Sequence, residues 1–221
     1  EYFWRKACTM KTVYVLCEGP TEKQFVQEVL YDVALSKNIY LLAPVVTTKV
    51  ADRKYYGGTS SYRKIRKDLL KLCNHSDAVI TSLFDLYALP KDTPGYKNQT
   101  QNHHDWALNI EKSVNDDIGL NNLHFNLVVH EFEALLYANP SAFQDYSKAV
   151  AEMMEKAMLT SGGNPELINN CFDTSPSHRI TQVYPEYSKP TVGVIISKRI
   201  GINTMREACP HFNEWLLFLG L

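Results

Sequence analysis

Two patterns of apolar and polar positions alternate along the first 140 residues of the chain. Short runs of β-branched and apolar residues predict buried strands at 12–17, 40–50, 78–84 and 123–129. Between and after them, apolar residues recur at helical spacing and predict helices at 21–36, 61–73, 104–117 and 132–138. We take Thr21 as the N-cap of the first helix, with Gln24 completing a capping box.

This repeated strand–helix order predicts an α/β domain with a largely parallel sheet. We expect a Rossmann-like sheet of about four strands, flanked by helices, over residues 10–140. Residues 141–221 are expected to form a mainly helical C-terminal region packed on the same domain, with the apolar stretch 212–219 against the core. Residues 1–9 precede Met10 and are interpreted as a tag remnant or an upstream extension.

Composition narrows the class of protein. Hydrophobic residues make up 45% of the chain, and 23 basic residues face 24 acidic ones, for a net charge of −1. This balance argues against binding nucleic acid through bulk charge, although a local basic patch remains compatible with it. The five cysteines form no CxxC pair, and no apolar run is long enough to span a membrane, so we expect a reduced, cytoplasmic protein.

Acidic residues follow the predicted strands at the points where the strands end. Glu18 follows the first strand, Asp85 ends the third, Glu131 and Glu133 follow the fourth, and Glu22 begins the first helix. Parallel strands would bring these carboxylates to one edge of the sheet, where ligands bind in open α/β folds. Oxygen ligands alone suit Mg²⁺ or Mn²⁺, and two such ions about 4 Å apart are the usual device for phosphodiester cleavage. The alternative for each acid is a helix cap or a solvated side chain.

Four motifs give the chain a family resemblance. They are CEGPTE at 17–22, FDLYALP at 84–90, HEFEALL at 130–136 and ACPHFNEW at 208–215. The first resembles the opening signature of Toprim domains of the OLD-like nuclease type. Together they resemble a Toprim-related family of unknown function (domain of unknown function 4276), found in anti-phage operons beside an ABC- or AAA-type ATPase. Gly57, Gly58, Tyr62 and residues 176–179 also match its pattern.

The resemblance implies a Toprim-like fold and a metal-dependent reaction on nucleic acid. It implies that Glu18 and Asp85 hold one metal ion, and that Glu22, Glu131 and Glu133 hold or share a second. Tyr87 stands where general Toprim domains carry a second aspartate, which weakens the first metal site.

A cation near the scissile phosphate is also expected, and Arg179, Lys189 and Lys198 are the candidates that the resemblance leaves open.

A basic segment is the second candidate feature. Eight lysines and arginines fall within residues 49–71, which hold only two acids, Asp52 and Asp68. Interleaved tyrosines would suit phosphate contacts with stacked bases, whereas an ordinary solvated helix face is the alternative. The candidate nucleic-acid-binding residues are Arg53, Lys54, Gly57, Gly58, Tyr62, Arg63, Arg66 and Lys67.

Two histidine patterns are set aside. His130-Glu131 is not a zinc-protease motif, because Ala134 stands where the second histidine is needed. His103-His104 is interpreted as a solvated pair in a polar loop.

Three hypotheses for function follow. The first is a Mg²⁺- or Mn²⁺-dependent nuclease that cleaves DNA or RNA, acting as the effector of a phage-defence system. The second is a catalytically weak effector or sensor subunit that binds a partner ATPase, since the chain has no P-loop of its own. The third is a phosphotransfer enzyme for a small nucleotide. The oligomeric state is left open.

Overall fold

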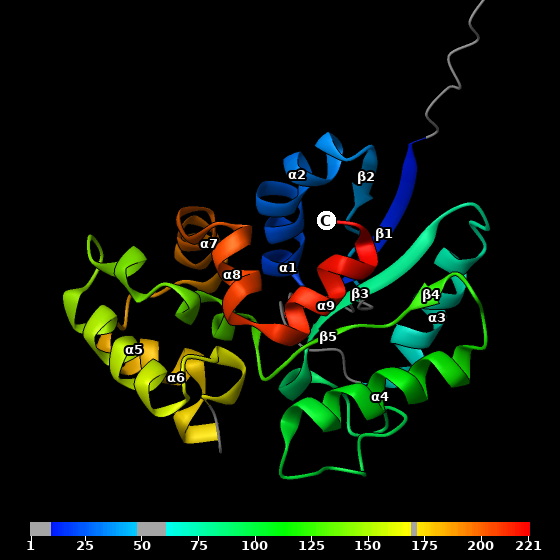
Figure 1. Ribbon diagram of the computed structural model, residues 1–221. Helices are drawn as coiled ribbons and strands as arrows, with labels where there is room; N and C mark the ends of the chain where they lie inside the picture. Colours follow the sequence, from blue (N-terminus) through cyan, green and yellow to red (C-terminus); the bar gives the residue numbers. More distant parts are fainter. Residues whose placement is uncertain (1–9, 48–60, 169–171) are drawn as a thin grey trace, which may run out of the picture.

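The computed structural model describes residues 10–47, 61–168 and 172–221, and it shows a parallel sheet with helices on both faces (Figure 1). β1 lies between β2 and β3, and β4 and β5 both pair with β3, all in parallel. The predicted α/β fold is therefore confirmed. The strands are β1 (Lys11–Cys17), β2 (Ile39–Leu42), β3 (Val79–Asp85), β4 (Leu123–His124) and β5 (Leu127–Val128).

Alternate residues of β1 face opposite sides of the sheet and enter separate cores. Val13 and Val15 pack with the helices of the N- and C-terminal parts, whereas Leu16 packs with α3 and α4. This period of two is what a strand covered on both faces requires. The α-helices are α1 (Pro20–Phe25), α2 (Tyr31–Ser36), α3 (Tyr62–Cys73), α4 (His103–Ile118), α5 (Lys148–Thr160), α6 (Pro176–Val183), α7 (Val194–Ile200), α8 (Ile202–Ala208) and α9 (Pro210–Leu219).

Shorter helical turns complete the described segments. Two π-helical turns, η1 and η7, join neighbouring α-helices or precede one, and the other turns are of the 3-10 type. They are η1 (Val26–Leu30), η2 (Leu86–Ala88), η3 (Phe132–Ala138), η4 (Pro140–Phe143), η5 (Pro165–Leu167), η6 (Phe172–Thr174) and η7 (Lys189–Gly193).

The first helical stretch begins earlier than predicted. Its N-cap is Gly19, so the assignment of Thr21 as N-cap and of Gln24 as its capping partner was wrong. Pro20 takes the first helical position, where its missing N–H is not needed. The carboxylate of Glu22 then reaches back and accepts a hydrogen bond from the Gly19 N–H at 3.0 Å. This bond fixes Glu22 at the carboxyl end of β1.

Two predicted strands are shorter in the structure. β2 ends at Leu42, because Pro44 has no N–H for the ladder; Val45 makes a single bridge to Cys17, and residues 48–50 lie outside the described segments. The strand predicted at 123–129 is split into β4 and β5. Between them, the Ser82 hydroxyl donates to the Asn126 carbonyl and accepts from the Asn126 N–H, both at 2.8 Å. A side chain of β3 thus replaces part of the backbone ladder.

The last helix ties the C-terminal part of the chain to the sheet. Trp215 of α9 is buried, and its indole N–H donates to the Thr81 hydroxyl of β3 at 2.9 Å. Phe212, Leu216 and Leu219 are buried beside it, whereas Leu217 is exposed. In Figure 1, α9 crosses the sheet above β3. None of the helices in the described segments is long and apolar enough to cross a membrane.

Candidate active site

The carboxyl edge of the parallel sheet carries the predicted acids. Glu18 follows β1 directly, and Asp85 is the last residue of β3. The Asp85 N–H donates to the Glu18 carboxylate at 3.3 Å, which joins the two strand ends. Glu22 lies in the first turn of α1 and Glu133 in η3; both are buried, with 4% and 2% of their surface exposed.

Lys189 lies at the centre of this group. Its ammonium nitrogen is 2.6 Å from Asp85 Oδ2, 3.2 Å from Glu22 Oε1 and 3.5 Å from Glu133 Oε2. The nitrogen also lies 5.5 Å from the centre of the Phe132 ring, where a cation is favoured. Of the three cations considered from the sequence, Lys189 is the one whose described contacts reach the carboxylates. We call Glu18, Glu22, Asp85, Glu133 and Lys189 the carboxylate cluster.

Backbone and tyrosine contacts hold the cluster in place. Asp85 Oδ1 accepts a hydrogen bond from the Phe132 N–H at 2.8 Å, and Glu133 Oε1 accepts one from the Tyr187 hydroxyl at 3.3 Å. Gly193 makes room for this tyrosine, since a Cβ at position 193 would lie 2.8 Å from the hydroxyl. The other oxygen, Glu133 Oε2, is buried and makes no hydrogen bond within the described segments; its one cationic neighbour there is Lys189, at 3.5 Å.

The negative charge of the cluster exceeds what one lysine compensates. Burial, together with the charges of Asp85 and Glu22, raises the pKa of Glu18 to about 8. Burial and the neighbouring carboxylates raise the pKa of Glu133 to about 7, and the pKa of Glu22 is raised for the same reasons. Burial alone would lower the pKa of Lys189, but the surrounding carboxylates hold it well above its usual value. The site therefore attracts a further positive charge.

Glu131 lies beside the cluster with both oxygens engaged. They accept hydrogen bonds from the N–H of Ser177 at 2.6 Å and from its hydroxyl at 2.9 Å. Burial raises the pKa of Glu131, and these bonds oppose the rise. Glu131 thus links the site to the first turn of α6.

Arg179 and Lys198 make contacts that do not involve these acids. Arg179 Nε donates to the Thr174 carbonyl at 2.7 Å, and Lys198 forms an ion pair with Glu28. The structure does not bring either cation into contact with a member of the carboxylate cluster.

The predicted basic segment is described only in part. Arg53, Lys54, Gly57 and Gly58 lie outside the described residues. In α3, Tyr62 is buried, so its ring offers no exposed face for stacking.

The basic residues of α3 differ in whether an acid of the described segments pairs with them. Arg66 Nε pairs with Asp117 at 2.8 Å, and the Tyr62 hydroxyl donates to the same carboxylate. Arg63 and Lys67 are exposed, one helical turn apart.

A histidine network next to the cluster was not predicted. His130 Nε2 lies 2.8 Å from the Glu166 carbonyl, an acceptor only, which places the proton on Nε2. Its Nδ1 lies 2.9 Å from the Tyr87 hydroxyl and 3.2 Å from His103 Nδ1. Burial lowers the pKa of His130 to about 4. The interpretation of His103 as a solvated loop residue was wrong, because it begins α4 and joins this network.

An unusual backbone conformation at His130 places the histidine network next to Glu131. His130 has a φ of 66°, in the left-handed region that a residue other than glycine adopts at a cost. The turn it makes separates β5 from Glu131 and η3. The sequence motif HEFEALL marks this position, but no apolar period predicts such a backbone conformation.

A surface pocket gives access to the cluster from solvent. It is lined by residues 18–22 and by Lys189 and Pro190. Glu18, Glu22 and Lys189 are thus reachable by a ligand, although the carboxylates themselves are largely buried.

Replacement of Lys189 by methionine should destabilise the protein strongly. The substitution leaves three buried carboxylates without their cation, and breaking a buried ion pair in this way costs about 3–5 kcal/mol. Urea unfolding followed by circular dichroism measures the loss. Lys198→Met is the matched control: its ion pair with Glu28 is exposed, so its loss should stay below ~1 kcal/mol. Equal losses in the two variants would contradict a central role for Lys189.

The stability difference between Glu18→Gln and the wild type should depend on pH. Because the folded pKa of Glu18 is raised to about 8 from an ordinary value of 4.5, the folded wild type holds a proton that the unfolded chain releases. Below the unfolded pKa of 4.5 this protonated carboxyl does not reduce the stability of the wild type. As pH rises from there through the folded pKa of about 8, where the buried carboxyl ionises, the wild type loses stability.

The Glu18→Gln variant carries no carboxyl at this position, so it does not lose stability in this way as pH rises. Its melting temperature relative to wild type should rise between pH 5 and pH 9 by at least about 2–4 °C, the shift that ~1 kcal/mol produces in a protein of this size. Glu207→Gln, an exposed acid in α8, is the control. A pH-independent difference for Glu18→Gln would argue against a raised pKa.

Comparison with known proteins gives one match. The model of the family described as domain of unknown function (DUF4276) matches residues 17–220. No curated protein and no solved structure matched the chain. The matched range contains the whole carboxylate cluster, the histidine network and all the helices of the C-terminal part. The chain therefore belongs to the DUF4276 family.

Proposed function

We propose that this protein is a Toprim-type nuclease that cleaves DNA or RNA phosphodiesters with Mg²⁺ or Mn²⁺. The observation that carries the proposal is the convergence of Glu18, Glu22, Asp85 and Glu133 at the carboxyl edge of a parallel sheet. The resemblance of the CEGPTE motif to Toprim nucleases supports the same chemistry. A role as effector of a phage-defence system is part of the proposal because the four motifs together resemble the family found in anti-phage operons.

The residues of the cluster fit a divalent metal. Their donors are carboxylate oxygens, which Mg²⁺ and Mn²⁺ prefer. Glu133 offers a buried oxygen that makes no hydrogen bond within the described segments, and burial together with the charges of Asp85 and Glu22 raises the pKa of Glu18. Glu18 and Asp85 would hold one ion, and Glu22 and Glu133 a second. When bound, the metal would supply Lewis acidity at a phosphate oxygen and an activated water.

Residues of the chain itself would carry the remaining steps. Glu18 lines the surface pocket and has a pKa of about 8 without metal, so near neutral pH it would give up a proton when it becomes a metal ligand. Lys189 lines the same pocket and would place its ammonium near a phosphate oxygen. Asp85 and Glu22 hold that ammonium in position. Positive charge fixed beside a phosphoryl group stabilises charge that develops in the transition state.

Exposed cations of α3 would contribute to binding nucleic acid. Arg63 and Lys67 are exposed and lie one turn apart on α3. Such residues contact phosphates rather than bases, so they would strengthen binding without selecting a sequence.

Glu133→Gln tests the nuclease proposal. The variant should cleave plasmid DNA, single-stranded DNA or tRNA at least about 100-fold more slowly than wild type with Mn²⁺, in the range seen when one group that stabilises a transition state is removed. The measurement is the initial rate of product formation on gels. Glu152→Gln, an exposed acid of α5, is the matched control and should keep the wild-type rate. Cleavage by Glu133→Gln at the wild-type rate would contradict the proposal.

One observation favours a second candidate function. The ammonium of Lys189 contacts Glu22, Asp85 and Glu133 in the space between them, and Tyr87 stands where general Toprim domains carry an aspartate. If Lys189 occupies the place of a metal ion among these carboxylates, metal-dependent catalysis would be weak. The protein would then act as an effector or sensor subunit that binds a partner ATPase. Purified wild type that cleaves none of the three substrates, yet co-purifies with such an ATPase, would favour this alternative.

A further inference from the structure

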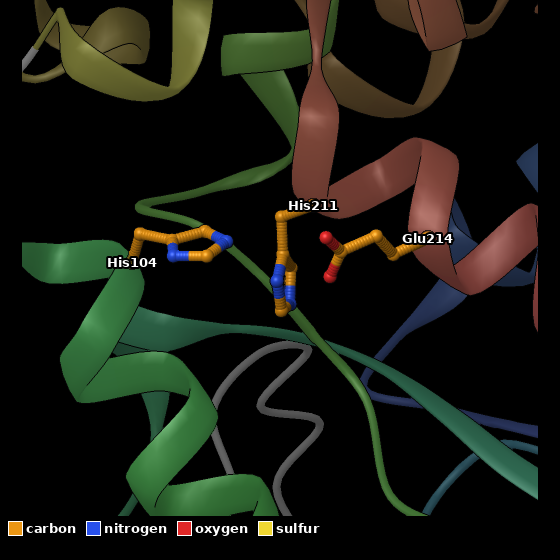
Figure 2. Close-up of side chains that lie close together, drawn as sticks. All are labelled: His104, His211 and Glu214. Atoms are coloured by element: carbon orange, nitrogen blue, oxygen red, sulfur yellow. The ribbon is translucent and has the colours of Figure 1, made fainter.

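A second group of side chains with metal-ligand chemistry lies between α4 and α9. His104 comes from the first turn of α4, and His211 and Glu214 come from the first turns of α9 (Figure 2). One ligand atom from each lies within 4.8 Å of the others. Over residues 10–47, 61–168 and 172–221, this is the one group of three or more His, Cys, Asp or Glu that converges so closely.

His211 has the hydrogen-bonding arrangement of a metal-ligating histidine. The side chain is 3% exposed, and its Nε2 lies 2.8 Å from Glu111 Oε1. A carboxylate accepts only, so Nε2 carries the proton of the neutral ring and Nδ1 keeps its lone pair. Nδ1 is buried and has no hydrogen-bond partner. In metal sites, a ligating histidine usually donates one ring N–H to a carboxylate, and the lone pair of the other nitrogen binds the metal.

The surroundings of His211 hold this arrangement in place. Glu111 Oε1 also accepts a hydrogen bond from the Leu127 N–H at 2.8 Å, which fixes the carboxylate against β5. The two oxygens of Glu166 accept from the N–H groups of His211 and Phe212, each at 3.0 Å. The start of α9 and the ring of His211 are thus positioned before any ligand arrives.

The other two side chains complete an open set of donors. His104 is half-buried, and Figure 2 shows its ring with a nitrogen at the tip facing His211. Its Nδ1 lies 3.8 Å from Asp105, which leaves Nε2 for a ligand. Glu214 is exposed, and in Figure 2 its carboxylate faces the His211 ring. The earlier interpretation of His104 as a solvated loop residue was wrong, because it lies in a helix against His211.

Electrostatics also favour a cation at this place. Burial opposes protonation of His211, but the hydrogen bond and charge of Glu111, with the charges of Glu166 and Glu214, raise its pKa. The negative charges of these three acids would also attract a metal ion to this place. Without a metal, His211 is a buried imidazole paired with Glu111.

We propose that His104, His211 and Glu214 form a binding site for a single Zn²⁺ ion that joins α4 to α9. Two imidazole nitrogens and one carboxylate suit zinc, whereas Mg²⁺ prefers oxygen donors. Zinc bonds of about 2.1 Å place tetrahedral ligands roughly 3.4 Å apart, and small rotations of the half-buried His104 and exposed Glu214 side chains would bring atoms that now lie within 4.8 Å to that spacing. Three protein ligands leave a fourth position for water. The site shares no residue with the carboxylate cluster and does not rest on the nuclease proposal.

Calorimetric titration of Zn²⁺ alone into the metal-free full chain tests this site. We expect one zinc per chain, and an affinity at least about tenfold weaker in Glu214→Gln and in His104→Ala, since even the outer partners of metal ligands change affinity 10–100-fold. Both substitutions are at accessible positions, so the variants should fold, and thermal melting without metal checks this. Zinc should also raise the melting temperature of wild type more than that of either variant.

Two controls separate this site from other zinc-binding groups. Glu207→Gln removes an exposed acid from the preceding helix, and Glu152→Gln removes an exposed acid from α5; both should bind zinc like wild type. Absence of zinc binding by wild type at micromolar concentrations would overturn the proposal. Equal affinity in wild type, His104→Ala and Glu214→Gln would overturn it as well.

Discussion

The ion pairs of Lys189 are the interaction on which the rest of the structure depends. Glu22, Asp85 and Glu133 are each less than a tenth exposed, and so many buried carboxylates would repel one another without a cation. The fold supplies this cation from the C-terminal part of the chain, while the acids come from the end of β3, the first turn of α1 and η3. The two parts therefore complete one site. Glu133 Oε2 has no hydrogen-bond partner among the described residues beyond its 3.5 Å ion pair with Lys189, so three buried carboxylates share one cation.

Glu166, in the 3-10 turn η5, contacts residues in or next to both cation-attracting groups. The carbonyl of Glu166 contacts His130, next to Glu131, whereas its carboxylate holds the backbone of His211. Oxygen donors gather at the sheet edge, and nitrogen donors gather between α4 and α9. Each group has a buried atom without a hydrogen-bond partner, and each suits a different class of metal ion. The two proposed roles, metal-dependent chemistry at the sheet edge and a zinc link between α4 and α9, therefore involve separate residues.

How far the sequence predicts this structure depends on the kind of interaction. The parallel sheet and the position of Glu18 and Asp85 follow from apolar runs and from strand ends, which are local patterns. Lys189 could be named only as one of three candidates, because its contacts join residues more than fifty positions apart. The φ of His130 and the pairing of His211 with Glu111 leave no periodic signal, since both depend on tertiary packing. The Gly19 N-cap was missed because a glycine before proline resembles a turn.

The most direct test of the account is calorimetric titration of Mn²⁺ into the full chain in two buffers with different ionisation enthalpies. Metal binding at Glu18 and Glu133 must release the protons that their raised pKa values retain near neutral pH. The account predicts that binding occurs, that its heat depends on the buffer, and that this dependence shrinks in Glu18→Gln. Absence of Mn²⁺ binding at millimolar concentrations, or binding whose heat is the same in both buffers, would contradict it.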